Sequence, residues 1–220
     1  VYCQGATASQ LTASLNPSNN GGTLNWYTVA SGGTASATAP TPSTLTAGTT
    51  MFYVSQTVGG VESNRTAIKV VVNPVPAQAS FTAIQPTCSV PKGSITVNAP
   101  LSGSFKYSVD SINYSKSTNF ININSGSIKV YVIDTTTGCF SAISTTINAA
   151  PAAPANPTIQ ITQPSCQSAT GSISISAPTG SNYIYSIDSI NYQSNANFTS
   201  VSAGTYRVRV KDISANCATD

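Results

Sequence analysis

The chain has 220 residues, of which 40% are hydrophobic and only 7% are charged, whereas a soluble globular domain usually has about 25% charged residues. Ser, Thr, Asn and Gly therefore make up most of the surface, a composition that is common on exported β-proteins and rare on cytosolic enzymes. The net charge of +3 is too weak and too scattered for a nucleic-acid-binding protein, and no apolar run of about 18 residues is present to span a membrane.

Hydrophobic alternation with period two dominates the chain and predicts half-buried strands. In chain order we expect strands at residues 24–29, 51–56, 67–72, 94–98, 105–109, 128–132, 143–147, 172–176 and 205–211. Gly, Asn, Ser and Pro clusters separate these runs at intervals that are typical of antiparallel sandwiches. No helical stripe is longer than two turns, so we predict an all-β chain of antiparallel β-sandwich modules.

An internal repeat determines the expected number of domains. Residues 85–139 align with residues 163–217 without gaps, with 22 identities in 55 positions. The shared stretches include Gln-Pro-x-Cys, Gly-Ser-Ile and Tyr-Ser-x-Asp-Ser-Ile-Asn-Tyr. We therefore expect two copies of one module.

Proline-rich linkers at residues 73–76 and 151–157 agree with the repeat, because proline stiffens a joint and cannot extend a strand ladder. We predict three domains, here called the first segment (1–73), the second segment (77–150) and the third segment (157–220). The third segment is expected to be truncated before its last strand, since the equivalent of residues 143–147 would lie beyond residue 220. The chain is accordingly expected to be a fragment of a longer repeat array.

Five cysteines indicate an oxidising compartment. Cys88 and Cys139 are 51 residues apart, as are Cys166 and Cys217, so equal spacing in equal modules predicts the disulfides Cys88–Cys139 and Cys166–Cys217. Cys3 is expected to be unpaired, either as a small buried hydrophobe or with a partner outside the fragment. A metal site is not expected, because the chain has no His and no Cys-x-x-Cys pair.

No catalytic, cofactor-binding or metal site is predicted. His, the usual general base, is absent, and the six acidic residues are thinly spread. Asp110 and Asp188 follow strands and are expected to form hairpin turns by accepting hydrogen bonds from nearby backbone N–H groups. Asp134 and Asp212 are poor calcium ligands, because calcium takes six to eight oxygen atoms.

Two further features have alternative interpretations. Residues Arg207, Arg209 and Lys211 alternate along one predicted strand, either as a solvated outer face or as a weak contact for acidic polysaccharide. Trp26 is expected in the core between sheets, with an exposed sugar-stacking platform as the alternative.

Residues 77–220 resemble the SprB-type repeat of giant cell-surface adhesins of Bacteroidota, the gliding-motility adhesin family. The resemblance rests on the three shared stretches above, on Asn119-Phe120 and its copy, on Ala203-Gly204-Thr205-Tyr206, and on Val-x-Val-x-Asp before the second Cys of each module. Residues 1–73 resemble the Ig-like module of the same proteins, through Tyr2-Cys3-Gln4-Gly5, Leu24-Asn25-Trp26-Tyr27-Thr28, Thr41-Pro42-Ser43-Thr44 and Tyr53-Val54-Ser55-Gln56-Thr57.

The first segment departs from that family pattern in one respect. The Ig-like module usually has a second Cys in an Asn-Gly-Cys-Glu-Ser stretch, where this sequence has Val61. The resemblance therefore implies that the first segment has no disulfide, which would explain the odd cysteine.

The resemblance implies tandem Ig-like β-sandwich modules that form an elongated rod, secreted by the type IX route to the extracellular cell surface. It implies a non-catalytic repeat adhesin or filament in attachment and gliding motility, without a cofactor. The expected partners are neighbouring repeats, surface polysaccharide, and outer-membrane secretion or motility machinery through regions outside this fragment. It also implies O-glycosylation at Asp-Ser/Thr sites, here Ser111, Thr135 and Ser189.

Two other functions remain open at this point. The chain could be a carbohydrate-binding module array of a secreted enzyme, which an exposed row of aromatic residues would favour. It could also be a filament subunit that exchanges strands, because the third segment is expected to lack its closing strand.

Overall fold

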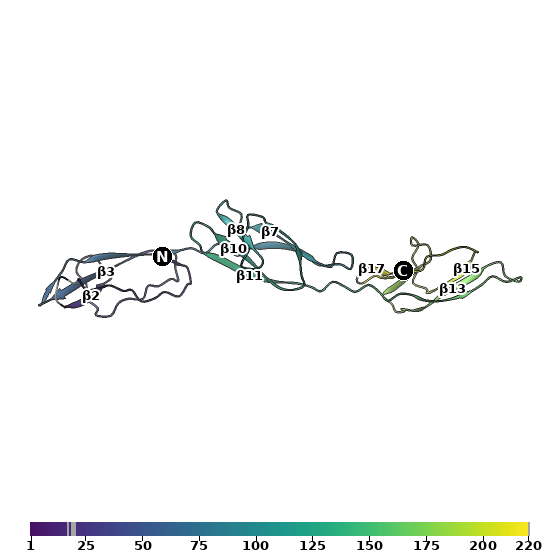
Figure 1. Ribbon diagram of the computed structural model, residues 1–220, viewed down its shortest axis with the longest axis horizontal. Coiled ribbons are helices and arrows are strands. Elements are labelled where there is room, and N and C mark those ends of the chain that lie inside the picture. Colours follow the sequence, from purple (N-terminus) through teal and green to yellow (C-terminus); the bar gives the residue numbers. More distant parts are fainter. Residues whose placement is uncertain (17, 19–20, 220) are drawn as a thin grey trace. The chain divides into compact units, whose positions relative to one another are not determined.

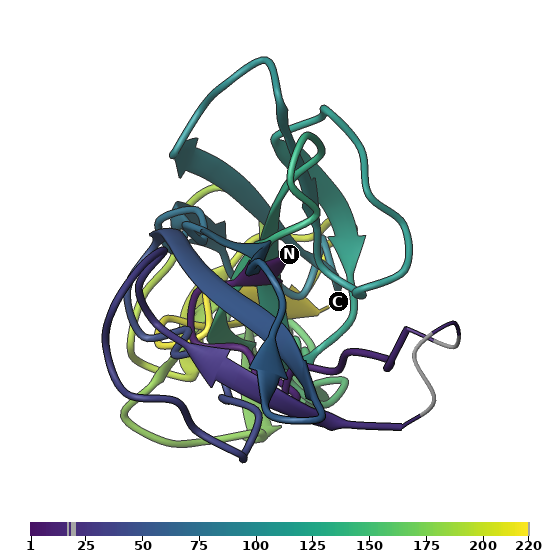
Figure 2. The same ribbon diagram turned by 90° about the vertical axis from the view of Figure 1, so that its left-hand side faces the viewer.

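The computed structural model describes residues 1–16, 18 and 21–219. These residues form strands, turns and loops, and Figures 1 and 2 accordingly show arrows and loops without a coiled ribbon. The prediction of an all-β chain of antiparallel sheets is therefore confirmed. Among the described residues, no helix is long and apolar enough to cross a membrane.

The first segment contains one five-stranded sheet with the order β1-β5-β3-β2, in which β4 also pairs with β3. Its strands are β1 (Tyr2–Cys3), β2 (Thr23–Tyr27), β3 (Gly48–Val58), β4 (Val61–Glu62) and β5 (Thr66–Asn73). Strand β1 runs parallel to the end of β5, whereas β3 pairs antiparallel with β2, β4 and β5. The buried apolar side chains of these strands are Trp26, Tyr27, Phe52, Val54, Val70 and Val72.

The second and third segments each contain two three-stranded sheets, with the orders β6-β7-β9 and β8-β10-β11, then β12-β13-β15 and β14-β16-β17. The strands of the second segment are β6 (Ser80–Ile84), β7 (Gly93–Ala99), β8 (Phe105–Ser108), β9 (Asn119–Ile123), β10 (Gly126–Asp134) and β11 (Phe140–Ile147). Those of the third segment are β12 (Thr158–Thr162), β13 (Gly171–Ala177), β14 (Tyr183–Ser186), β15 (Asn197–Val201), β16 (Arg209–Asp212) and β17 (Cys217–Thr219). The first four strands of the two segments begin and end at equivalent positions when the two copies of the repeat are aligned.

Alternation of side chains explains these strands. On β7, Ile95 is 0% and Val97 is 2% exposed, while the residues between and beside them face away from the core. Because successive strand residues point to opposite faces, the period-two pattern of the sequence becomes one buried and one hydrated face.

The chain divides into two compact units, each of which takes part of the second segment. The first unit comprises Val1–Ser80, Asn98–Ser117 and Lys129–Ile143, and the second comprises Phe81–Val97, Thr118–Ile128 and Ser144–Asp220. The boundaries of the three predicted domains therefore remain a prediction.

Strand β16 is shorter than the sequence predicts. A strand was expected at residues 205–211, but β16 begins at Arg209, and residues 205–208 lie outside any strand. In the second segment the equivalent residues belong to β10, whose neighbour β11 is eight residues long. In the third segment the equivalent neighbour β17 has three described residues, so residues 205–208 lack a strand beside them.

The end of β11 is fixed by two contacts in the second unit. Ile147 is only 1% exposed and packs over Gly93. The Gln85 Nε2 group donates a hydrogen bond to the Thr146 carbonyl oxygen at 3.1 Å, and the Asn148 N–H donates to Gln85 Oε1 at 2.8 Å. The Gln of the repeated Gln-Pro-x-Cys stretch thus holds the main chain on both sides of Ile147.

The contact at Gly93 predicts a strong effect of a small substitution. A Cβ atom there would lie 2.8 Å from Ile147 Cγ2 and 2.9 Å from the Ile84 carbonyl oxygen. We expect Gly93→Ala to lower the free energy of unfolding by about 1–3 kcal/mol, because the strand end must move outward. Gly103→Ala is the matched control, since a Cβ atom at Gly103 meets nothing within 4 Å. Urea unfolding of both variants measures the difference, and equal stabilities would contradict this packing.

Candidate functional site

The repeated Asp loops are the best-defined polar sites of the chain. Asp110 Oδ1 accepts hydrogen bonds from the Ile112 N–H at 2.9 Å and the Asn113 N–H at 2.8 Å. Asp110 Oδ2 accepts from Asn113 Nδ2 at 2.7 Å, and the buried Ser108 hydroxyl donates to Oδ1 at 2.7 Å. The predicted turn, in which Asp bonds nearby backbone N–H groups, is confirmed.

The third segment repeats this geometry atom for atom. Asp188 Oδ1 accepts from the N–H groups of Ile190 and Asn191 at 2.9 and 2.8 Å, and from the Ser186 hydroxyl at 2.9 Å. Asn191 Nδ2 donates to Asp188 Oδ2 at 2.6 Å. Because both oxygens of each carboxylate serve its own loop, neither Asp is placed as a general base.

Each loop exposes an isoleucine at its tip. Ile112 is 80% and Ile190 is 81% exposed, which is unusual for this residue type, and in both loops the preceding serine has a positive φ. The Asp-centred hydrogen bonds hold this backbone in place without a hydrophobic contact at the tip.

The three predicted glycosylation residues lie in different surroundings. Ser111 is exposed at the tip of its loop with φ 63°, whereas its copy Ser189 is half-buried. Thr135 is exposed, but its hydroxyl donates a hydrogen bond to the Ser104 carbonyl oxygen at 2.8 Å. Modification at these residues stays a prediction, with Ser111 as the most accessible of the three.

The predicted cysteine pairs are wrong. The structure joins Cys3 to Cys139 and Cys88 to Cys217, with Cα–Cα distances of 5.5 and 5.9 Å, and leaves Cys166 as an exposed free cysteine. Cys3, which was expected to be unpaired, is therefore bonded. The expectation that the first segment has no internal disulfide agrees with the structure, because the partner of Cys3 belongs to the second segment.

The repeat itself explains why equal spacing misled the prediction. The second cysteine of each repeat, Cys139 or Cys217, is fully buried and directly follows the turn after β10 or β16. Each bonds the first cysteine of the preceding segment, Cys3 or Cys88. In this arrangement both copies of the repeat have the same kind of bond, and the same would be true of bonds within each module. Equal spacing of the cysteines therefore does not distinguish bonds between segments from bonds within them.

Glu62 forms two hydrogen bonds next to Val61, the position of the missing cysteine in the first segment. Val61 is 75% exposed on β4, but the adjacent Glu62 carboxylate accepts hydrogen bonds from the hydroxyls of Ser55 and Tyr27. These two bonds, with a smaller effect of Arg65, lower the pKa of Glu62.

Asp134 and Asp212 serve the turns that follow them. Asp134 and Asp212 each bond the turn that follows them, and the hydroxyls of Thr136 and Ser214, respectively, lower their pKa values. Among the residues that the structure describes, no group of three His, Cys, Asp or Glu side chains could hold a metal ion.

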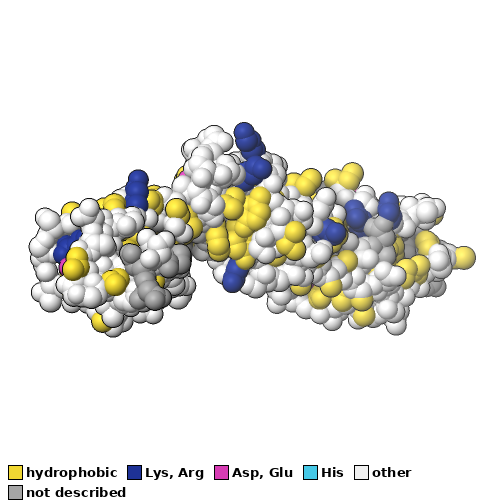
Figure 3. Space-filling view, turned by 60° about the vertical axis from the view of Figure 1, so that its left-hand side comes forward, with side chains coloured by type: hydrophobic (Ala, Val, Ile, Leu, Met, Phe, Trp, Pro, Cys, Tyr) yellow, Lys and Arg dark blue, Asp and Glu magenta, His cyan; other side chains and the backbone are white. Residues whose placement is uncertain are grey.

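The basic side chains do not form one face of one strand. Arg207 lies outside β16 and is exposed, whereas Arg209 and Lys211 are half-buried on that strand. On the face shown in Figure 3, Lys and Arg side chains lie in separate places on a mainly uncharged surface.

An aromatic cluster on the second segment was not predicted. The Tyr131 ring on β10 lies 6.2 Å from the Phe140 ring on β11 and 6.4 Å from the Tyr114 ring, measured between centroids. Phe140 is 54% exposed and the two tyrosines are half-buried. Trp26, in contrast, is 4% exposed, so its predicted place in the core is confirmed and the sugar-stacking alternative is excluded.

Comparison with known proteins identifies the first segment. Residues 1–74 match the family described as "Ig-like domain CHU_C associated", which confirms the Ig-like resemblance of this segment. No curated protein matches the chain. The Ig-like all-β fold fits a structural module without catalytic activity, and this fold and the disulfides are compatible with an extracellular or surface protein.

The Asp loops predict an unusual pH dependence. Hydrogen bonds from Asn113, Ile112 and Ser108 hold the pKa of Asp110 far below its usual value, and Asn191, Ile190 and Ser186 do the same for Asp188. A depressed folded-state pKa gives stability that is present above the unfolded pKa of about 3.9 and is lost as the pH falls towards the folded-state pKa. NMR titration should therefore find both carboxylates still ionised at pH 3. Ordinary Asp titration near pH 4 would contradict the loop geometry.

Proposed function

We propose that this chain is part of a secreted, non-catalytic repeat adhesin of the bacterial cell surface, which acts in attachment and gliding motility. The observation that carries the proposal is the pair of disulfides between successive segments. Each bond spans a linker, because Cys3–Cys139 bypasses residues 73–76 and Cys88–Cys217 bypasses residues 151–157. A pulling force can therefore pass between segments through a covalent bond that does not depend on the linker.

The chemistry of the chain supports this use. Disulfides form and persist in oxidising compartments such as the exterior of the cell. Contacts made by a polar, sparsely charged surface also change little in strength with the salt concentration, since ions screen only interactions between charges. Export by the type IX route, filament assembly and contact with outer-membrane machinery through other regions of the protein belong to the same proposal.

Exposure on living cells tests the proposal. We expect an externally added protease to degrade the protein on intact cells of the source bacterium, and antibody fragments against the third segment to reduce attachment. A cytosolic enzyme probed in the same samples controls for lysis. Protection of the protein until the cells are broken would contradict surface display, and unchanged attachment would contradict the adhesive role.

The aromatic cluster favours a second candidate function, binding of surface polysaccharide. Tyr114, Tyr131 and Phe140 offer ring surface beside polar groups, which is the combination that sugars bind. The third segment has Tyr192, Arg209 and Ala218 at the equivalent positions, so this contact would belong to the second segment.

Native affinity electrophoresis in gels that contain a neutral glucan or alginate tests this contact. We expect the polysaccharide to retard the chain and Phe140→Ser to lose most of that retardation, because Phe140 has the most exposed ring of the cluster. Ile121→Ser is the matched control, since Ile121 is 67% exposed in the same segment and does not belong to the cluster. Equal retardation of both variants, or none of the wild-type chain, would refute the contact.

A further inference from the structure

One part of the core is less buried in the third segment than in the second. Identical residues at equivalent positions are buried in the second segment and more exposed in the third: Pro86 and Pro164, Gly93 and Gly171, Val130 and Val208. Three identical pairs in the core keep the same burial: Tyr107 and Tyr185 at 2%, Val132 and Val210 at 0%, Cys139 and Cys217 at 0%. The more exposed residues of the third segment lie around one site.

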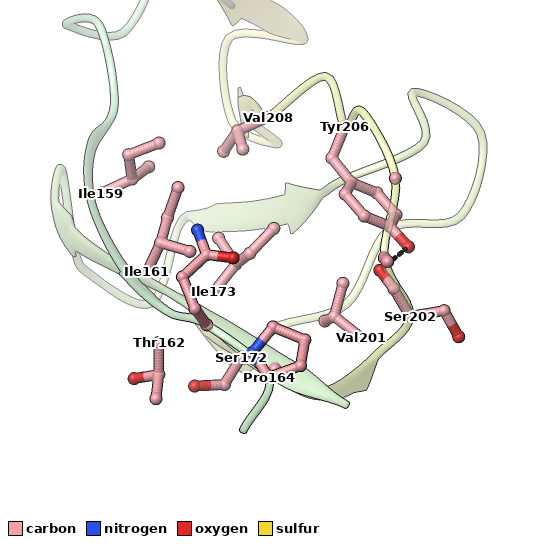
Figure 4. Close-up of a pocket in the computed structure, with 14 residues that line it drawn as sticks. Ile159, Ile161, Thr162, Pro164, Ser172, Ile173, Val201, Ser202, Tyr206 and Val208 are labelled. Carbon is pink, nitrogen blue, oxygen red and sulfur yellow. Dashed lines mark hydrogen bonds between the residues drawn. The ribbon is translucent and has the colours of Figure 1, made fainter. Parts of the chain in front are cut away.

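That site is a pocket of about 230 Å³ in the third segment. Figure 4 shows apolar side chains around it, from Ile159 and Ile161 on β12, Ile173 on β13, Val201 on β15, and Tyr206 and Val208 in the following stretch. Ile161 is 55% and Ile159 is 41% exposed, although both belong to a sheet. An exposed apolar sheet surface of this kind indicates a missing neighbour.

The second segment shows which neighbour occupies the equivalent place. There the end of β11 places Ile147 over Gly93, and the Gln85 amide bonds the main chain at residues 146 and 148. In the third segment, Gly171 and Gln163 line the pocket, and within the described part of the chain the Gln163 amide has no hydrogen-bond partner. The third segment thus has the apolar surface and the Gln side chain that hold the end of β11 in the second segment. Its described residues do not include the strand that they would hold.

We propose that this pocket holds a strand that continues β17, with an isoleucine over Gly171 and its main chain bonded to Gln163. Strand β17 already runs in the direction that this requires. Its pairs Val210↔Thr219 and Asp212↔Cys217 keep the register of the hairpin between β10 and β11. Six more residues in the same register reach the position that Ile147 has in the second segment.

The same strand would also give residues 205–208 a neighbour with which to form strand hydrogen bonds. Residues 205–208 lie outside any strand in the third segment, whereas their equivalents in the second segment belong to β10. A strand that extends β17 passes alongside these residues and pairs with them. In the second segment the equivalent stretch is residues 143–148, Ile-Ser-Thr-Thr-Ile-Asn, so we expect a strand of similar sequence in the pocket.

The inference commits to a continuous strand for a geometric reason. Strand β17 occupies the edge that leads to the pocket, so a strand from another molecule would have to begin directly after Thr219. The inference holds whether or not the chain is an adhesin.

Grafting tests the proposal on the full chain. The hexapeptide Ile-Ser-Thr-Thr-Ile-Asn is appended after residue 220, and hydrogen exchange is compared with that of the original chain. We expect the amides of Tyr206 and Val208, whose N–H groups would face the added strand in this register, to exchange at least about tenfold more slowly, the change that about 1.4 kcal/mol gives. A graft with Asn in place of its second Ile is the matched control and should give little protection.

The Gln163 contact has its own variant pair. Gln163→Ala should remove much of the protection that the graft gives, while Gln167→Ala, in the same exposed loop, should leave it unchanged. Protection of the β13 amides in every variant shows that the third segment is folded. Equal protection by both grafts, or no protection by either, would overturn the proposal. Strong protection by the free hexapeptide where the graft fails would instead assign the pocket to a separate partner.

Discussion

Covalent bonds between successive segments are the constraint on which the rest of the structure depends. Each segment has small sheets and few buried side chains, and small domains need a covalent link or a metal to add to a limited core. The bonds Cys3–Cys139 and Cys88–Cys217 close loops of 136 and 129 residues, and each contributes about 5 kcal/mol in the chain-entropy model. Cys139 and Cys217 are buried, and each bonds a cysteine of the preceding segment. The same bond therefore both stabilises the fold and joins two segments.

Local patterns determined what the sequence could predict. The nine expected strands follow from alternation and the two equivalent segments follow from the internal repeat, whereas strands such as β6, β9, β12 and β15 were not expected. The loops at Asp110 and Asp188 were predictable from local sequence, since each carboxylate bonds N–H groups two and three residues away.

Contacts between distant residues determined what the sequence could not predict. The cysteine partners depend on which segment end lies beside which hairpin, and the spacing of a repeat is compatible with bonds within or between its copies. The early end of β16 depends on the extent of its neighbour β17. The aromatic cluster had one usable signal, because the register of the hairpin between β10 and β11 brings Tyr131 close to Phe140, but Tyr114 comes from a separate loop.

Cleavage of one linker tests the central claim most directly. A specific protease site is introduced at residues 151–157, the native oxidised chain is cut, and the products are separated on denaturing gels with and without reductant. If Cys88–Cys217 joins the second and third segments, the two pieces stay together without reductant and separate with it, and Cys88→Ser separates them under both conditions. Pieces of the original chain that separate without reductant would show that no disulfide joins the second and third segments and would contradict the account.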